Sequence, residues 1–134
     1  MTGAWRAADL MLRVAGGAVA TAAGLVTAVW ALYLVPLRVD TWVGQVRLPV
    51  AVLLATAGNL LLIRFARNVT GTRWGALLPG VSWFAVIVLS LEATSEGDRL
   101  LVPNDWVATL TIFGGVVTIV VGTALAFVDR STMT

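Results

Sequence analysis

The chain has 134 residues, of which 59% are hydrophobic and only 12% are charged, and its mean hydropathy is +0.93. A soluble domain carries about 25% charged residues, and a domain of this length buries too little surface to hide so many apolar side chains from water. An ordinary water-soluble fold is therefore excluded. The net charge of +2 is the excess of nine arginines over seven acidic residues. The arginines are spread along the chain, a pattern that argues against nucleic acid as a partner.

Cysteine and histidine are both missing from the chain. Their absence excludes disulfides, Cys or His zinc sites and histidine-ligated haem. It also removes the Ser-His and Cys-His pairs that activate nucleophiles. The sequence contains no phosphate-binding glycine loop, dinucleotide fingerprint or nucleophile elbow. We therefore expect no catalytic residue, no metal and no cofactor, and a protein that is not an enzyme.

Four apolar runs follow one another along the chain. Crossing about 30 Å of hydrocarbon takes roughly 20 helical residues, with a range of about 17–25. The runs at 14–35, 74–91 and 106–128 meet this length. The first is also longer than the apolar part of a cleaved signal peptide. We expect each of these three runs to form a transmembrane helix.

The remaining run, at 48–63, is the shortest and lies between Arg47 and Arg64. Arginine side chains can reach the headgroup layer while their stems stay in the apolar region, which lengthens a short span. We predict a full span here, with a re-entrant hairpin as the alternative. The expected fold is then an all-α bundle of four transmembrane helices with short loops, in one domain over residues 1–134.

Arginines are divided unequally between the two sides of this bundle. The side with both termini carries Arg6, Arg13, Arg64, Arg67, Arg73 and Arg130, and the other side carries Arg38, Arg47 and Arg99. Short cytoplasmic loops of membrane proteins are enriched in basic residues. We therefore expect a multi-pass protein with both termini in the cytoplasm.

Tryptophans mark the predicted ends of the spans. Indole rings favour the membrane interface, and the residues at these positions are Trp5, Trp30, Trp42, Trp74 and Trp106. Trp83 is the exception, near the middle of the third span. It either faces lipid or fills the core, and the core is favoured if Asn59 or a serine lies within reach of its N–H.

Two outer loops connect the spans. In the first, valines alternate around Gly44-Gln45, which indicates a very short β-hairpin at the membrane surface.

The second outer loop runs from residue 92 to 105 and is acidic. Asn104 or Asp105 can cap the fourth helix, and Asp98, Asp105 and Trp106 are the candidate site residues of this side. Carboxylates suit hard cations, but no EF-hand spacing is present and we favour an exposed acidic surface.

Small residues recur at every fourth position in two spans. Such a series forms one helix face on which another backbone can approach closely, and helices in lipid associate through such contacts. We favour packing inside the bundle; the alternative is an interface with a partner protein or a second copy. The residues are Gly16, Ala20 and Gly24 in the first span and Gly114, Thr118, Gly122 and Ala126 in the fourth.

Two polar residues lie within the predicted spans. Asn59 is deep in the second span, where an amide needs a hydrogen-bond partner, and Ser82, Ser90 or a threonine of the fourth span could supply one. We favour a structural role for Asn59 over a transport site. Arg13 lies near the start of the first span, where we expect it to reach the interface rather than line a pathway.

Three segments carry a resemblance to a known family. They are residues 38–62, with a Val-Gly-x-Val-x-Leu-Pro core and Ala57-Gly58-Asn59-Leu60, residues 72–80, and residues 96–103. They are similar to a family of uncharacterised four-span membrane proteins of actinobacteria, over about residues 34–106. The resemblance implies a four-span fold in an actinobacterial plasma membrane and carries no activity. It singles out Asn59, the Pro79-Gly80 pair and Gly97-Asp98.

Together these features predict a small protein of a bacterial plasma membrane with the lipid bilayer as its surroundings. We expect a non-catalytic accessory or scaffold subunit that binds another membrane protein or a second copy of itself. The alternative is a small homodimeric transporter. Proton-coupled exporters of this size need an intramembrane carboxylate, and the four runs contain none.

Overall fold

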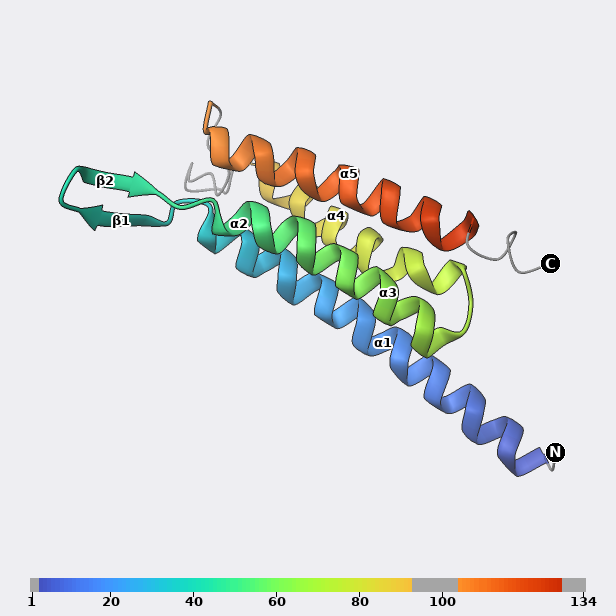
Figure 1. Cartoon of the computed structure of the whole chain (residues 1–134). Helices are drawn as coiled ribbons and strands as arrows, with labels where there is room; N and C mark the ends of the chain where they lie inside the picture. The colour runs from blue at the N-terminus through green and yellow to red at the C-terminus, as the bar shows by residue number, and fades with distance from the viewer. Residues whose placement is uncertain (1–2, 93–103, 129–134) are drawn as a thin grey trace.

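The computed structural model describes residues 3–92 and 104–128 (Figure 1). Its helices form four rods that run side by side, and a two-stranded sheet projects from one end. The first rod is α1 (Gly3–Leu34), and the fourth is α5 (Trp106–Val128). The second rod joins α2 (Val50–Leu53), the π-helical segment η1 (Leu54–Gly58) and α3 (Asn59–Thr70). The third rod joins the 3-10 segment η2 (Trp74–Leu77) and α4 (Leu78–Leu91). The predicted all-α four-helix bundle is confirmed.

Each rod is long and apolar enough to cross a membrane. The third and fourth rods have the bounds expected from the sequence, 74–91 and 106–128. The protein is thus a multi-pass membrane protein. The start of α1 and the end of α5 lie at one end of the bundle, called the terminal end below, and the sheet lies at the other, called the hairpin end (Figure 1).

The second rod is longer than the predicted span of 48–63. It is a continuous helix from Val50 to Thr70 and has 21 residues, so it is not a re-entrant hairpin. Arg64 and Arg67 do not end it, because arginine is a good helix former and can extend its charge towards the headgroups. Gly71 ends it instead, in a left-handed conformation with φ of 65° and with its N–H bonded to the Arg67 carbonyl oxygen.

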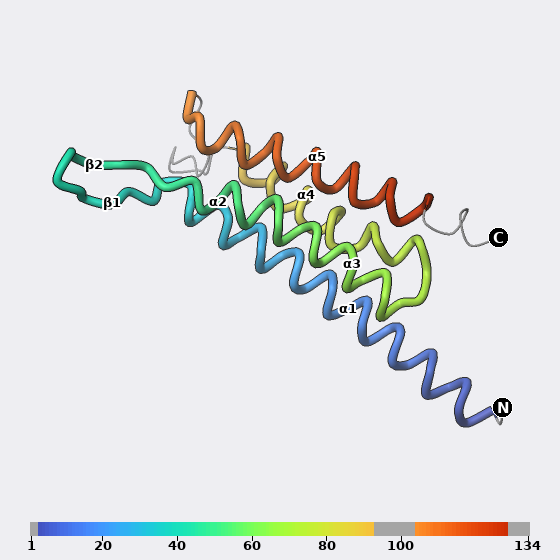
Figure 2. Tube along the Cα trace, in the orientation of Figure 1, coloured from blue at the N-terminus to red at the C-terminus, as the bar shows by residue number. Residues whose placement is uncertain are grey.

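α1 also exceeds its predicted span of 14–35, because it begins at Gly3. At about 1.5 Å per residue its 32 residues extend about 48 Å, well beyond the roughly 30 Å of a hydrocarbon core. The trace in Figure 2 shows the first turns of α1 continuing past the other rods at the terminal end. The side chains of this part of α1 are exposed.

The second rod lies between α1 and α5. α1 packs on α4 and on α3, whereas α5 packs on α2, η1 and α3. The core is built mostly from small side chains that bring the helices close together, with Trp83 as its largest member. Its buried residues at the hairpin half of the bundle are Ala28, Leu32, Val35, Ala51, Ala55, Trp83, Ile87, Val107 and Ala108.

The sheet is the β-hairpin expected from the sequence. β1 (Arg38–Thr41) pairs antiparallel with β2 (Gly44–Arg47), and Thr41 lies opposite Gly44. Trp42 and Val43 form the two-residue turn, and Gly44 has a φ of 117°, which a side chain would disfavour. The hairpin projects beyond the helix ends along the direction of the rods rather than lying against them (Figure 1).

Candidate interaction sites

The small residues of α1 pack inside the chain. A Cβ atom added to Gly24 would meet the Ser82 side chain and would lie 2.8 Å from the Pro79 carbonyl oxygen of α4. A Cβ atom at Gly16 would meet the Val69 side chain of α3, 2.7 Å away. Ala20, between them, is fully buried. This face of α1 is therefore covered by α3 and α4.

The small residues of α5 are covered in the same way. A Cβ atom on Gly114 would lie 2.9 Å from the Thr56 methyl group, and one on Gly122 would lie 3.0 Å from the Ile63 side chain. Thr118 is half-buried and Ala126 is buried. Both series of small residues thus face neighbouring helices of the same chain, the packing favoured from the sequence.

Asn59 lies at the centre of the bundle and is fully buried. It is the first residue after the π-helical segment η1. Within the described residues, neither its amide nitrogen nor its amide oxygen has a hydrogen-bond partner. The hydroxyl groups expected to bind this amide donate instead to backbone carbonyl oxygens of their own helices. These bonds are 3.0 Å from Ser82 to Pro79, 2.7 Å from Ser90 to Ile87 and 2.7 Å from Thr111 to Val107.

Trp83 fills the core, one of the two positions expected for it. Its side chain is fully buried, and the six-membered ring packs against Gly115, where a Cβ atom would collide with it. Its indole N–H has no partner among the described residues, so the expected bond to Asn59 or a serine is not formed. Thr123 Oγ1 is also buried without a partner among the described residues, so the bundle encloses three side chains with unsatisfied polar groups. Each such group costs about 1–3 kcal/mol.

Arg13 lies at the terminal end and joins α1 to the end of α3. Its Nε donates to Asp9 at 2.8 Å, and its Nη1 donates to the Thr70 carbonyl oxygen at 3.3 Å. The last carbonyl groups of a helix carry a partial negative charge and have no partner within the helix. Arg13 therefore caps the C-terminus of α3.

Asp105 is buried at the hairpin end, where two groups bind it. Its Oδ1 accepts the Val107 N–H at 3.0 Å, which is the predicted cap of α5, and it also lies 2.5 Å from Nη1 of Arg47. The expectation of an exposed acidic surface is wrong for Asp105, because the Arg47 side chain covers it. Trp106 is half-exposed, and Asp98 lies outside the described residues.

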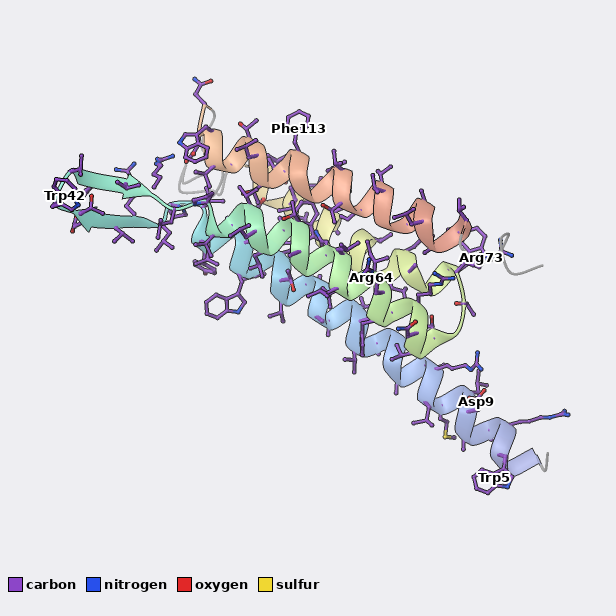
Figure 3. All side chains as sticks on the ribbon, viewed as in Figure 1. Trp5, Asp9, Trp42, Arg64, Arg73 and Phe113 are labelled. Atoms are coloured by element: carbon purple, nitrogen blue, oxygen red, sulfur yellow. The ribbon has the colours of Figure 1, made fainter. Side chains whose placement is uncertain are left out.

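Trp42 stands at the tip of the hairpin and is fully exposed (Figure 3). Val43 beside it is 74% exposed, and every residue of β1 is exposed. The hairpin carries Trp42 beyond the helix ends, and its expected position at the membrane interface stays a prediction. The sequence pattern indicated the hairpin but not the direction in which it projects.

A groove runs between α3 and α5 at the terminal end, with a volume of about 380 Å³. Its walls are apolar except for two arginines of α3. The lining residues are Leu60, Ile63, Arg64, Arg67, Gly122, Leu125, Ala126 and Val128. Sequence reasoning missed this site, because it placed Arg64 and Arg67 in a loop rather than on a helix beside α5.

Comparison with known proteins adds no relative. No protein-family model, curated protein or solved structure matches the chain. Within residues 3–92 and 104–128, no group of three acidic side chains is placed to hold a metal ion.

Proposed function

We propose that this protein is a non-catalytic accessory subunit of a membrane complex, and that its hairpin is the contact with the partner. The observation that carries the proposal is the fully exposed Trp42 at the tip of an isolated hairpin. Burying an exposed tryptophan on association is strongly favourable, and tryptophan is enriched among the residues that dominate binding energies.

The isolation of the hairpin supports the same proposal. A two-stranded hairpin alone is marginally stable in water, and both outer edges of this one have no strand beside them in the described chain. A partner that covered the hairpin would bury its apolar side chains, and a strand of the partner could pair with its edge.

The base of the hairpin is fixed to the bundle. The Leu48 N–H donates to the Leu37 carbonyl oxygen at 3.2 Å and closes the base of the hairpin, and Arg47 binds Asp105 at the start of α5 and so joins the hairpin to the bundle. These contacts hold the direction of the two strands, so Trp42 is presented at a defined position above the bundle. A preorganised contact loses less conformational entropy on binding.

The side of the membrane follows from the arginines, which favour a cytoplasmic terminal end. The hairpin then faces the outside of a bacterial plasma membrane, and the partner is a membrane protein with an extracytoplasmic surface. The matching test attaches a cysteine-reactive, membrane-impermeant label. Trp42→Cys should react in intact cells and Gly3→Cys should not, and the reverse result would invert the orientation.

Gentle solubilisation of the full chain tests the accessory role. One protein should co-purify in fixed proportion with the unchanged chain and with Trp30→Ala, which alters a lipid-facing tryptophan of α1. Trp42→Ala should lose it while the bundle stays folded. A lone monomer or homodimer in mild detergent, with no partner retained, would contradict the proposal.

A homodimeric transporter is the second candidate, and the unsatisfied amide of Asn59 favours it. A polar group without a partner in the middle of a membrane bundle is a candidate for binding a substrate. Proton-coupled flux of a substrate in proteoliposomes that vanishes with Asn59→Leu and persists with Trp42→Ala would establish this function in place of the first.

A further inference from the structure

The groove between α3 and α5 has the features of a lipid site. Its volume of about 380 Å³ falls in the range of about 300–1,000 Å³ typical of ligand pockets. Leu60, Ile63 and Leu125 line it with aliphatic side chains. Gly122 forms part of its wall, packed closely beside Ile63. Such a groove accommodates an acyl chain.

Arg64 lines the groove and supplies the second feature. Figure 3 shows it projecting from α3 on the side of α5. It lies six residues before Thr70, the end of α3, which places it about 9 Å inside the helix end at about 1.5 Å per residue. A guanidinium at this depth is costly in hydrocarbon unless an anion or the headgroup layer accommodates it.

The charge of the terminal end selects the kind of headgroup. Among the described residues the one carboxylate at this end is Asp9, and it pairs with Arg13. In the sequence the same side carries Arg6, Arg13, Arg64, Arg67, Arg73 and Arg130 against Asp9 and Asp129. With Arg64 and Arg67 lining the groove, the excess of positive charge on this side of the sequence favours an anionic lipid over a zwitterionic one.

We propose that this groove binds a phospholipid with an anionic headgroup. One acyl chain lies between α3 and α5 along Leu60 and Leu125, and the phosphate group binds Arg64. Basic pockets between transmembrane helices are a recurrent form of lipid recognition. Guanidinium groups bind phosphate through paired hydrogen bonds, which makes arginine suited to the task. The bound lipid would fill the gap between α3 and α5 and hold the two helices together.

The test measures how much lipid the full chain retains in dodecylmaltoside. Dioleoylphosphatidylglycerol or dioleoylphosphatidylcholine is added, and bound lipid is counted by native mass spectrometry. The unchanged protein should retain the anionic lipid about five-fold more strongly, the factor expected for about 1 kcal/mol from one arginine. Equal retention of the two lipids would overturn the proposal.

Two pairs of variants separate the headgroup from the acyl chain. Arg64→Gln should remove the preference for the anionic lipid, whereas Arg38→Gln, on the hairpin, should leave it. Leu125→Trp should fill the groove and lower retention of both lipids, whereas Leu110→Trp, on the same helix outside the groove, should not. Leu125 and Leu110 are both about half-exposed, so neither change enters the core.

Two further results would contradict the proposal. An unchanged preference in Arg64→Gln would show that the headgroup is bound elsewhere. Displacement of the anionic lipid by excess inorganic phosphate would show an anion site with no acyl chain in the groove. If Arg64→Gln did not yield folded protein, the Leu125→Trp and Leu110→Trp pair would decide, because equal retention in these two variants excludes the groove.

Discussion

Arg47 at the base of the hairpin and Asp105 at the start of α5 form an ion pair with 2.5 Å between Nη1 and Oδ1. The Arg47 side chain is 27% exposed and the Asp105 side chain 7% exposed, so water screens the pair only in part. The same carboxylate oxygen accepts the Val107 N–H. One aspartate thus begins the last helix and holds the hairpin to the bundle.

The two roles of Asp105 can be separated by substitution. Asp105→Asn keeps a capping oxygen and loses the ion pair, and we expect a loss of about 1–2 kcal/mol of stability. Asp105→Ala loses both, and we expect about 1 kcal/mol more. Thermal unfolding in detergent measures the two, and Arg47→Gln should lower stability at least as much as Asp105→Asn, because it leaves the buried carboxylate without its counter-charge. If the asparagine and alanine variants were equally stable, the cap would have no energetic role.

Glycines of α1 should differ in their tolerance of larger side chains. Gly24→Leu should lower stability by about 1–3 kcal/mol or more, because α4 already occupies the space beside Gly24. Gly16→Leu should act in the same direction through Val69 of α3. Gly3→Leu is the control, since a Cβ atom there meets no atom within 4 Å. Equal melting temperatures for the three variants would refute the packing described for α1.

Replacing Asn59 by leucine should stabilise the bundle. The buried amide has no partner in the described chain, and an apolar side chain of similar size removes a cost of about 1–3 kcal/mol. Asn68→Leu, at an exposed position of α3, is the control and should change stability little. Lower stability of Asn59→Leu in detergent would instead indicate that a water molecule or another group satisfies the amide.

Arg13 should matter more than the carboxylate with which it pairs. Arg13→Gln removes the charged donor to the Thr70 carbonyl oxygen, and we expect a loss of about 0.3–1 kcal/mol. Asp9→Asn removes only an exposed pair and should cost less than about 0.5 kcal/mol. Amide hydrogen exchange in the last turn of α3 should rise in the first variant only. Equal exchange in both would exclude the capping role of Arg13.

The sequence allowed some elements to be predicted closely. α5 has its predicted bounds because an apolar run follows Asp105, and the side chain that starts a helix lies next to it in sequence. The hairpin followed from alternating valines around a glycine. These features depend on neighbouring residues, which a sequence shows directly.

Other features could not be predicted in this way. Some depend on contacts between residues far apart in the chain. Others depend on where a helix ends, which composition does not determine. The pair between Arg47 and Asp105 joins the end of β2 to the residue before α5, and the contact of Trp83 with Gly115 joins two rods. Arg64 was expected to end a helix because it is charged, whereas the helix continues to Thr70. An arginine near the interface is compatible with a helix that ends there and with a helix that continues past it.

The π-helical segment η1 changes how the second rod can vary in length. The buried positions of the second rod run from Ala51 to Thr70. They span one residue more than the roughly 18 residues that five regular α-helical turns would take. A chain lacking one residue of η1 could form an uninterrupted α-helix with both halves facing the same neighbours. A deletion within α3 would instead turn one half by about 100°. The rod therefore contains a place inside the membrane where a related protein could be one residue shorter and keep the same bundle.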